Sequence, residues 1–430
     1  MLSEEQDAIR QAVIDELSLH KIILINGSAG TGKTYLAAAI INDFTYAGHE
    51  VLITAPTHQA LNVLKEKLKV DEATLDDNSL NWKTEMRKTF ETVHSALQMK
   101  RIINKYTGEV TFRKDLYAKY EKGIYKGKYY VMIVDEASML EKGILDILEK
   151  LDNVYLLFLG DIKQINPVVE PISEVFTRGY KTFTLLTYKR QNADNPIIDI
   201  SLNPNKLALK QKSLVGNQGY LFNNNIETLT DRIAKSPDNI VYLAWTNDAV
   251  NLVNKKVREK IYKTPNRYEL GEYVIFDRPY GEYYNRQKVK IRSLKTEERT
   301  LSVPNERSYV DKKGKLCNAV RIDLKCYIIN NSIIVLHESD VMTFFDLSVE
   351  IKQMCEHAGF DWKLYYGFIE QVASLKYSYA MTVHVSQGST FFATIVDVGN
   401  IYKNPDRGEA KRLLYTAITR SSNVTIFYNT

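Results

Sequence analysis

The chain has 430 residues, of which 25% are charged and 44% hydrophobic, and its formal net charge is +5. This is the composition of a soluble globular protein, and the length favours two or three domains over a single core. No run is apolar for long enough to span a bilayer, and the acidic first residues lack the features of a secretion signal, so we expect a cytoplasmic protein. The three cysteines (Cys317, Cys326 and Cys355) do not have the spacing of a zinc site.

The first 190 residues alternate short apolar runs with helical stretches. The runs Ile22–Ile25, Val51–Ala55, Val131–Val134 and Val154–Leu159 predict buried parallel strands, and Gln59–Leu68 has a helical pattern. This alternation predicts a doubly wound α/β domain.

One segment interrupts the alternation. Residues Arg101–Lys114 alternate polar and apolar side chains around a Thr-Gly turn, which predicts a β-hairpin with basic and aromatic residues near its tip. An ordinary surface hairpin would have the same pattern, so the sequence alone leaves its role open.

A second α/β pattern begins near Asn192, with a strand at Ile240–Ala244 and a helix at Asp248–Tyr262. Between Glu269 and Ile334 the chain changes to short strands with polar turns, which predicts a small inserted β-barrel. After a helical stretch at Ser339–Gly359 the α/β pattern resumes. Its predicted elements are the strand Ala380–His384, the strand Ala393–Val398, the helix Glu409–Ala417 and the strand Val424–Tyr428.

The strongest local signal is a glycine-rich loop that follows the first apolar strand and opens a helix. It consists of Gly27, Ser28, Ala29, Gly30, Thr31, Gly32, Lys33 and Thr34 and fits the phosphate-loop pattern G-x-x-x-x-G-K-[ST]. Backbone N–H groups of such a loop bind phosphate oxygens, Lys33 would reach the β- and γ-phosphates of ATP, and Thr34 would bind Mg²⁺.

Two further strands end in polar residues that suit the same chemistry. Asp135 and Glu136 follow Val131–Val134, where Asp135 would hold the Mg²⁺ and Glu136 would activate the attacking water. Gln164 follows the strand that ends at Gly160-Asp161, and its amide would contact the γ-phosphate. Arg190 and Arg420 could reach that phosphate if the second α/β domain packs on the first. Two solvent-facing arginines are the alternative.

The order of these motifs resembles that of superfamily 1B helicases, in the RecD-like group, over almost the whole chain. GSAGTGKT corresponds to motif I, Ala55–His58 to motif Ia, DEAS to motif II, GDIKQINPV to motif III and TYKRQ to motif IV. Residues Tyr379–Gly388 resemble motif V, and Leu414–Arg420 match motif VI. One departure concerns motif V, where Val385 stands in place of the lysine that is usual in the family.

The resemblance implies further site residues. Gln6 would read the adenine, and Gln387 and Gly388 would also lie at the nucleotide. Single-stranded DNA would be contacted by Pro56, Thr57, His58, Thr92, His94, Thr246, Asn247, Thr382, His384 and Ser386. Each of these histidines could equally be a packed structural residue. Tyr106, at the tip of the predicted hairpin, is the residue we expect to meet the duplex.

The resemblance also implies an architecture and an activity. Two RecA-like P-loop domains would comprise residues 1–190 (domain 1A) and residues 191–264 with 365–430 (domain 2A). A pin at about residues 95–118 would form domain 1B, and an SH3-like β-barrel with helices at 265–364 would form domain 2B. The expected enzyme is a monomeric, ATP- and Mg²⁺-dependent helicase that moves 5′ to 3′ on single-stranded DNA and unwinds tailed duplexes, with replication or recombination proteins as its possible partners.

Three other interpretations compete with this one. A translocase that displaces proteins from DNA would have the same motor residues and differ only at the pin. A P-loop kinase or small-molecule NTPase would lack the ordered DNA-contacting motifs and Arg420. A non-enzymatic nucleic-acid-binding module would require a damaged phosphate loop, whereas Lys33 and Glu136 are both present.

Overall fold

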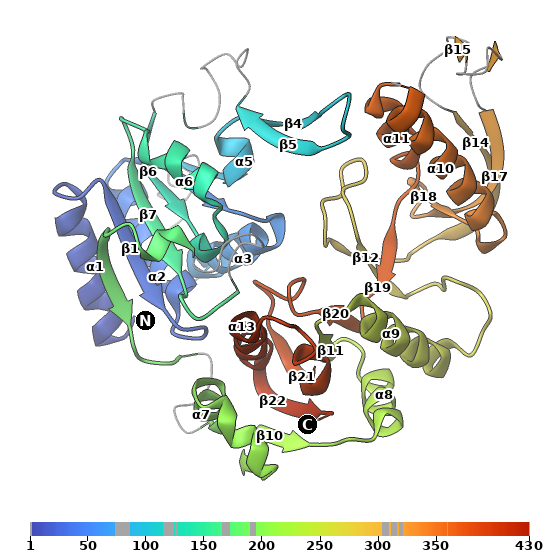
Figure 1. Ribbon diagram of the computed structural model, residues 1–430. Coiled ribbons are helices and arrows are strands. Elements are labelled where there is room, and N and C mark those ends of the chain that lie inside the picture. The colour runs from blue at the N-terminus through green and yellow to red at the C-terminus, as the bar shows by residue number, and fades with distance from the viewer. Residues whose placement is uncertain are drawn as a thin grey trace. The chain divides into compact units, whose positions relative to one another are not determined.

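A computed structural model describes residues 2–73, 87–114, 124, 128–165, 173–189, 195–302, 309–310, 316–317, 321–358 and 360–429. The chain divides into two compact units (Figure 1). The core unit comprises Met1–Gln98, Tyr117–Ile261 and Tyr379–Thr430, and the insert unit comprises Met99–Leu116 and Tyr262–Ser378. Within the described residues no helix is long and apolar enough to cross a membrane.

The first sheet of the core unit has six parallel strands in the order β3-β2-β6-β7-β1-β8. These strands are β1 (Ile22–Gly27), β2 (Glu50–Ala55), β3 (Lys88–Thr92), β6 (Tyr129–Val134), β7 (Tyr155–Gly160) and β8 (Lys181–Leu185). The four strands predicted from apolar runs are confirmed, and they occupy the middle of the sheet. Strands β3 and β8 lie at its two edges and were not predicted.

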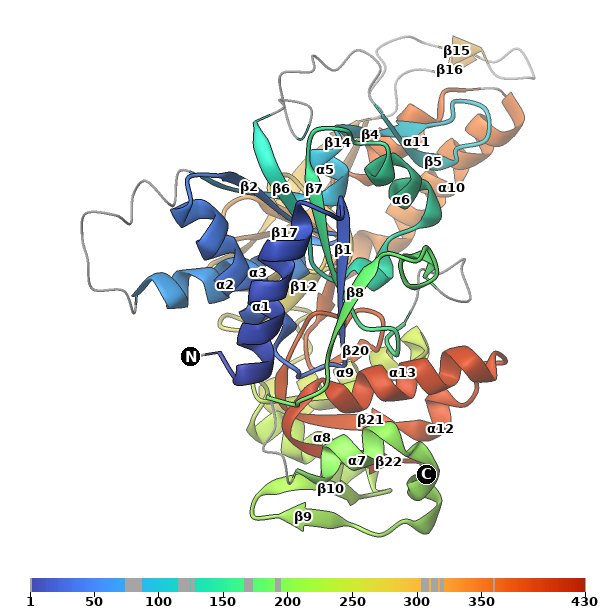
Figure 2. The same ribbon diagram turned by 90° about the vertical axis from the view of Figure 1, so that its left-hand side faces the viewer.

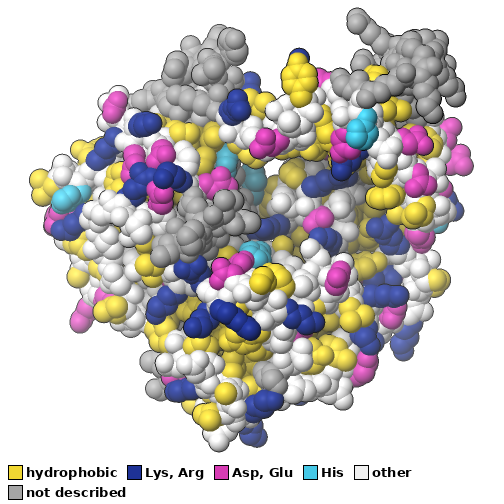
Figure 3. All heavy atoms as spheres, in the orientation of Figure 1, with side chains coloured by type: hydrophobic (Ala, Val, Ile, Leu, Met, Phe, Trp, Pro, Cys, Tyr) yellow, Lys and Arg dark blue, Asp and Glu magenta, His cyan; other side chains and the backbone are white. Residues whose placement is uncertain are grey.

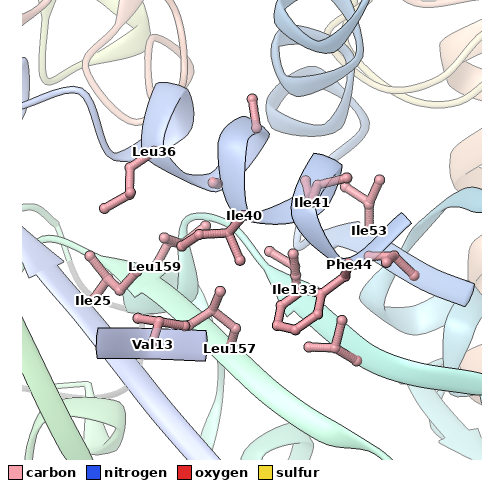
Figure 4. Close-up of a cluster of buried hydrophobic side chains, with 14 of the residues drawn as sticks. Val13, Ile25, Leu36, Ile40, Ile41, Phe44, Ile53, Ile133, Leu157 and Leu159 are labelled. Carbon is pink, nitrogen blue, oxygen red and sulfur yellow. The ribbon is translucent and has the colours of Figure 1, made fainter. Parts of the chain in front are cut away.

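Helices cover this sheet and bury its apolar side chains. They are α1 (Glu4–Leu17), α2 (Lys33–Tyr46), α3 (His58–Ala73), α5 (Val93–Ala96) and α6 (Lys142–Glu149), with 3₁₀ turns η2 (Ala137–Met139) and η3 (Glu174–Phe176). Figure 4 shows the cluster in which Val13 of α1 and Ile40 of α2 pack against Ile25, Ile133 and Leu157 of the strands. Each such aliphatic side chain stabilises the fold by about 1.5–3 kcal/mol when it is fully buried. This packing fixes the strand ends from which the polar motifs extend.

The second sheet of the core unit has the order β20-β11-β21-β22-β10-β9 and is parallel except at the edge pair β9–β10. Its strands are β9 (Ser213–Val215), β10 (Gln218–Phe222), β11 (Ile240–Ala244), β20 (Ala380–Thr382), β21 (Phe391–Asp397) and β22 (Ser421–Tyr428). The accompanying α-helices, labelled in Figure 2, are α7 (Pro196–Leu202), α8 (Ile226–Lys235), α9 (Asn247–Tyr262), α12 (Val398–Ile401) and α13 (Arg407–Thr419). A 3₁₀ helix, η4 (Pro204–Leu209), follows α7. The predicted second α/β domain is therefore confirmed.

The insert unit contains the predicted hairpin and a group of short antiparallel strands. The hairpin pairs β4 (Met99–Ile103) with β5 (Val110–Lys114). The other strands are β12 (Tyr273–Phe276), β13 (Lys288–Lys290), β14 (Leu294–Ser302), β15 (Tyr309–Val310), β16 (Leu316–Cys317), β17 (Arg321–Ile329), β18 (Ile333–Leu336) and β19 (Leu375–Tyr377). Its helical elements are η5 (Glu338–Asp340), α10 (Val341–Ala358) and α11 (Trp362–Ile369).

Two three-stranded sheets, β13-β12-β19 and β14-β17-β18, form the body of the insert unit. Strand β19 lies outside the range in which we predicted the short strands, and it completes the first of these sheets by pairing with β12. Apolar residues of β17 and β18 pack with those of β12, and others pack against α10 and α11. The strands and the helices therefore stabilise one another.

Candidate functional site

A cavity of about 550 Å³ opens in the core unit beside the carboxyl ends of β1, β6 and β7. Side chains predicted from separate motifs meet at this cavity, as expected when parallel strands end at one edge of a sheet. The cavity is lined by Ala29, Gly30, Gly32, Lys33, Thr34, Ala60, Val63, Glu66, Asp135, Glu136, Gln164, Lys189, Gly388, Thr390 and Arg420.

The glycine-rich loop has the backbone that its sequence predicts. Gly30 and Gly32 have φ values of 90° and 84°, a left-handed conformation that glycine adopts without strain. Gly32 precedes α2, and a Cβ atom added there would lie 2.5 Å from Nε2 of Gln6. Gln6 itself is buried and donates from Nε2 to the backbone oxygen of Thr31 at 3.3 Å. The loop therefore needs glycine for both conformation and space.

Lys33 is buried at the start of α2 and folds back on the loop. Its Nζ donates to the backbone oxygens of Gly27 (2.5 Å) and Ser28 (3.2 Å). The ammonium group therefore lies within the loop that would hold phosphate oxygens, and it can exchange these carbonyl oxygens for a more strongly attracting anion.

The two acids that follow β6 have distinct environments. Asp135 is buried, and its Oδ1 accepts the backbone N–H of Glu136 at 2.9 Å. Glu136 has φ 52° and ψ 40°, a left-handed conformation that costs a non-glycine residue about 1–3 kcal/mol. Its Oε2 is buried and has no hydrogen-bond partner in the part of the chain that the structure describes. A strained backbone thus holds a carboxylate oxygen that is available to a water molecule.

Asp161 and Gln164 continue the site after β7. Both are buried, and Gln164 donates from Nε2 to Oδ2 of Asp161 at 3.3 Å. The backbone N–H of Lys163 donates to the other carboxylate oxygen of Asp161 at 3.0 Å. The amide of Gln164 is therefore held at the cavity rather than in solvent.

Arg420 caps the carboxyl end of α13 in the second α/β domain and lines the same cavity. It is only 2% exposed, so the alternative of a solvent-facing arginine is wrong for this residue. Its guanidinium donates to the backbone oxygens of Thr416 (3.2 Å) and Ser389 (3.3 Å). Burial lowers its pKa, and the nearby Glu136 carboxylate opposes this effect. The other predicted arginine, Arg190, lies outside the described residues.

The structure adds cavity residues that the sequence motifs did not indicate. Lys189 precedes Arg190 in TYKRQ, and its backbone N–H donates to the oxygen of Gly30 at 2.7 Å. Glu66 reaches the cavity from α3. Tyr415, which lies within motif VI, contacts the phosphate loop through its hydroxyl group. Only proximity to a recognised motif could have suggested Lys189 and Tyr415, and nothing in the sequence pattern indicated Glu66.

Four threonines of the predicted DNA-contacting motifs share one structural role. Thr57 follows β2, and Thr92 is the last residue of β3. The Oγ1 atom of each accepts the N–H group of the residue three positions later, at 3.2 Å. Thr246 and Thr382 do the same after β11 and at the end of β20, at 3.4 Å each. These strands are the neighbouring pairs β3-β2 and β20-β11 at one end of each sheet. Each hydroxyl therefore caps the turn or helix that begins at its strand end.

The remaining predicted DNA contacts differ in exposure. Pro56 is half-buried and Asn247 is exposed, whereas Ser386 is fully buried and its hydroxyl donates to the oxygen of Val383 at 2.7 Å. Gln387 is also buried and donates to the oxygen of Ile165 at 3.4 Å. The side chains of Ser386 and Gln387 therefore bond within the core unit in this structure.

The three histidines lie at the same strand ends. Burial lowers the pKa of His58, as does the charge of Lys65, and burial lowers the pKa of His94. His384 lies 3.4 Å from a carboxylate oxygen of Glu409. The first two are therefore neutral at pH 7, where they can act as hydrogen-bonding groups but carry no charge.

The predicted hairpin is fixed to helix α11 within the insert unit. Trp362 donates from Nε1 to the oxygen of Tyr106 at 3.2 Å, and Tyr366 donates from its hydroxyl to the oxygen of Gly108 at 3.0 Å. Arg101 pairs with Glu370 at 2.6 Å and lies over the ring of Tyr366. The tip is thus held by its backbone, which leaves side chains of the hairpin free to project outward.

Several apolar side chains of this hairpin are exposed, as Figure 3 shows over β4 and β5. Tyr106 at the tip is 73% exposed, and Ile102, Val110 and Phe112 are also exposed. A two-stranded hairpin with this many exposed apolar residues has the character of a contact surface.

Comparisons with known proteins agree with this geometry. Residues 10–170 match the AAA domain family model, and residues 377–426 match the UvrD-like helicase C-terminal domain. The first range contains the phosphate loop and both acids, and the second contains Arg420. The ATP-dependent DNA helicase Dda of Enterobacteria phage T4 is 29% identical over 281 residues, which cover 61% of this chain and 57% of Dda. The chain is a superfamily 1B helicase related to Dda.

Two further relatives match over more of the chain. The RecBCD enzyme subunit RecD of Buchnera aphidicola (from Schizaphis graminum) is 24% identical, and the match covers 98% of this chain and 72% of RecD. The uncharacterized protein R530 of Acanthamoeba polyphaga mimivirus is 26% identical over 94% of both chains. The helicase described here is accordingly an enzyme that binds and hydrolyses ATP.

Solved structures agree on the helicase fold. Pif1 helicase from Bacteroides is 17% identical, with a TM-score of 0.52 over 99% of this chain and 92% of that chain. Pif1 helicase from Candida albicans is also 17% identical, with a TM-score of 0.50 over 99% and 94%. The two α/β sheets of the core unit are therefore the two RecA-like domains of this helicase fold.

Proposed function

We propose that this helicase moves 5′ to 3′ along single-stranded DNA, powered by ATP hydrolysis, and unwinds duplexes that carry a single-stranded tail. The observation that carries the ATP-driven motor is the cavity at which the phosphate loop, Glu136 and Gln164 meet Arg420 of the second RecA-like domain. The direction is what the resemblance to superfamily 1B helicases implies. A site built from both domains lets nucleotide binding and hydrolysis change how the domains are held together. The similarity to Dda, which is named an ATP-dependent DNA helicase, supports DNA as the track.

The proposed chemistry at the cavity follows from the environment of each group. Lys33 binds the β- and γ-phosphates. The resemblance to superfamily 1B helicases implies that Gln6 reads the adenine. Thr34 and Asp135 both line the cavity, and a hydroxyl and a carboxylate are suitable ligands for Mg²⁺, which would neutralise phosphate charge. Glu136 takes the proton of the attacking water, because its buried Oε2 has a free lone pair at the cavity.

Arg420 and Gln164 report the γ-phosphate in the proposed cycle, together with Arg190. Arg420 gives up its hydrogen bonds to Thr416 and Ser389 in favour of the phosphate, because a guanidinium binds an anion more strongly than a carbonyl oxygen. Loss of the γ-phosphate after hydrolysis removes that attraction. The two RecA-like domains then grip the strand alternately.

The strand ends that carry the four capping threonines are the proposed DNA surface. The N-terminus of a helix offers unpaired backbone N–H groups and a partial positive charge to a phosphate oxygen. Helices α3 and α9 both begin next to such a threonine, one in each RecA-like domain. Contacts of this kind carry no base identity, which suits a motor that must cross any sequence.

The hairpin is the proposed pin of this helicase. We assign about residues 95–118 to the pin domain 1B, inserted in domain 1A (1–190). Residues 262–378 form domain 2B with its SH3-like barrel, because α11 and β19 pack with the other strands of the insert unit, and 191–261 with 379–430 form domain 2A. The exposed apolar side chains at and near the tip, Tyr106 above all, are suited to stack on the first base pair of a duplex. A translocase without unwinding remains the second candidate, because it would need every motor residue but not this surface.

The test measures ATP hydrolysis with and without single-stranded DNA, and then unwinding of duplexes with a 5′ or a 3′ tail. Strong stimulation with unwinding from the 5′ tail alone is the expected result. Unwinding from the 3′ tail would overturn the direction, and stimulation without unwinding would favour the translocase. Absence of stimulation would mean that the threonine-capped strand ends do not bind DNA. RNA of the same sequence serves as a second substrate that tests the choice of track.

A further inference from the structure

Tyr415 belongs to α13 of the second RecA-like domain, but its hydroxyl group bonds to two loops of the first. The hydroxyl accepts the backbone N–H of Ala29 in the phosphate loop at 3.1 Å and donates to Oδ2 of Asp161 at 3.0 Å. The same carboxylate oxygen accepts the amide of Gln164 at 3.3 Å. A chain of hydrogen bonds therefore runs from the phosphate loop through Tyr415 and Asp161 to Gln164.

The chemistry of a buried phenol suits this position. Burial raises the pKa of Tyr415, and the negative charge of Asp161 raises it further, so the hydroxyl remains protonated. A protonated phenol can accept from one group and donate to another at the same time. Tyr415 is therefore able to bond to the N–H group and to the carboxylate simultaneously.

A comparison with Arg420, five residues later in the chain, separates the roles of the two side chains. The guanidinium of Arg420 donates to Thr416 and Ser389 in its own domain. The hydrogen bonds of Tyr415 lead to Ala29 and Asp161 in the other domain. Tyr415 thus links the two RecA-like domains at the phosphate loop in the conformation described.

We propose that Tyr415 is a positioning residue of the ATPase. It couples the positions of the phosphate loop and of Gln164 to the position of helix α13. The inference rests on the proposed function, because it assigns to Tyr415 the transmission of DNA-driven domain movement to the nucleotide cavity. Tyr415 touches no reacting atom in this proposal. Its hydroxyl holds Ala29 and, through Asp161, the amide of Gln164 in the positions that hydrolysis requires.

The test compares Tyr415→Phe with the wild-type enzyme in steady-state ATP hydrolysis, with and without saturating single-stranded DNA. Phenylalanine keeps the ring but removes both hydrogen bonds. We expect KM for ATP to change by less than about twofold, because ground-state binding by the loop is retained. The ratio of kcat with DNA to kcat without DNA should fall at least about tenfold, because the link that carries the stimulation is lost.

Tyr242→Phe is the matched control. Tyr242 is a buried tyrosine of β11 whose hydroxyl donates to the buried carboxylate of Asp397, also in the core unit. Its substitution breaks a tyrosine–aspartate bond of the same kind without touching the phosphate loop. We expect a similar decrease in melting temperature in the two variants, and a wild-type stimulation ratio in Tyr242→Phe alone.

An unchanged ratio in Tyr415→Phe, or equal losses in the two variants, would overturn the inference. If Tyr415→Phe does not fold, Asp161→Ala removes the oxygen that accepts from both Tyr415 and Gln164, and an unchanged ratio there would also overturn the inference. Failure of the proposed function is distinguishable, because the wild-type enzyme would then show no stimulation by DNA. Stimulation of the wild type and of Tyr415→Phe to the same degree would contradict the inference and leave the proposed function intact.

Discussion

Gly108→Ala should detach the hairpin from α11 without altering the nucleotide cavity. Gly108 has a φ of 71°, and a Cβ atom built there would lie 2.4 Å from Cδ2 of Trp362, which is closer than real Cβ contacts. The indole must therefore move, which breaks its hydrogen bond to Tyr106 and disturbs the bond from Tyr366 to Gly108. The single added methyl group therefore disturbs both hydrogen bonds that attach the hairpin tip to α11.

The size of the effect follows from the contacts. Each hydrogen bond contributes about 1 kcal/mol, and the left-handed conformation costs an alanine about 1–2 kcal/mol. The sum of about 3–4 kcal/mol corresponds to a change of roughly two to three powers of ten in the docking equilibrium. If the docked hairpin splits the duplex, the number of base pairs unwound for each ATP hydrolysed should fall at least about tenfold, and ATP hydrolysis stimulated by single-stranded DNA should stay within about twofold.

Unwinding, ATP hydrolysis and tryptophan fluorescence are measured on the same preparation. Trp362 is 6% exposed, so undocking should shift the emission to longer wavelength. Gly179→Ala is the matched control, because Gly179 has a φ of 73° and an added Cβ would meet nothing within 4 Å. A shift in emission with normal unwinding would refute the role of the anchored hairpin. An unchanged emission would refute the argument from the clash.

The nucleotide cavity gives three further predictions, and one histidine gives a fourth. Lys33→Ala should lose ATP hydrolysis together with most ATP binding, measured with a fluorescent ATP analogue. Glu136→Gln should lose hydrolysis by about 10²–10⁴-fold and still bind ATP, because only the base is removed; normal turnover would exclude Glu136 as the base. Arg420→Ala should bind ATP and DNA but hydrolyse at least about 10³-fold more slowly, and normal hydrolysis would contradict its role across the domain interface. Because burial lowers the pKa of His94 below its ordinary value of 6.5, the unfolded chain binds this proton first as the pH falls. Stability should therefore decrease below about pH 6.5, and urea titrations should show a smaller decrease in His94→Gln.

The central strands of the first sheet could be predicted because they are buried on both faces and form continuous apolar runs. Its edge strands β3 and β8 could not. In β3 all five residues are only partly buried, and in β8 partly buried and exposed residues alternate along Lys181–Thr184 before the buried Leu185. A strand with one neighbour and one exposed side has no need of a continuous apolar run, so its sequence resembles that of a loop.

The phosphate loop and the acids after β6 were predictable because their chemistry depends on residues close together in the sequence. Tyr415 was not, because its partner Ala29 lies 386 positions away and no local spacing connects them. The left-handed backbone of Glu136 also leaves no mark in the sequence, since glutamate is not a residue that favours this conformation. The interaction of Trp362 with the hairpin could not be predicted either, because its partner Tyr106 is also distant in the sequence.

The capping threonines change how a mutational survey of this helicase should be interpreted. At Thr57 and Thr246 the side-chain oxygen is already used to hold a helix start, and the proposed donors to DNA are backbone amides that an alanine substitution leaves in place. An alanine scan would therefore record a loss of about 1 kcal/mol in helix stability and underestimate the DNA contact. Replacing an amide by an ester through chemical ligation would report on that contact directly. For the same reason a surface of this kind tolerates substitution, and Val385 in place of a lysine is the sort of change that it can accept.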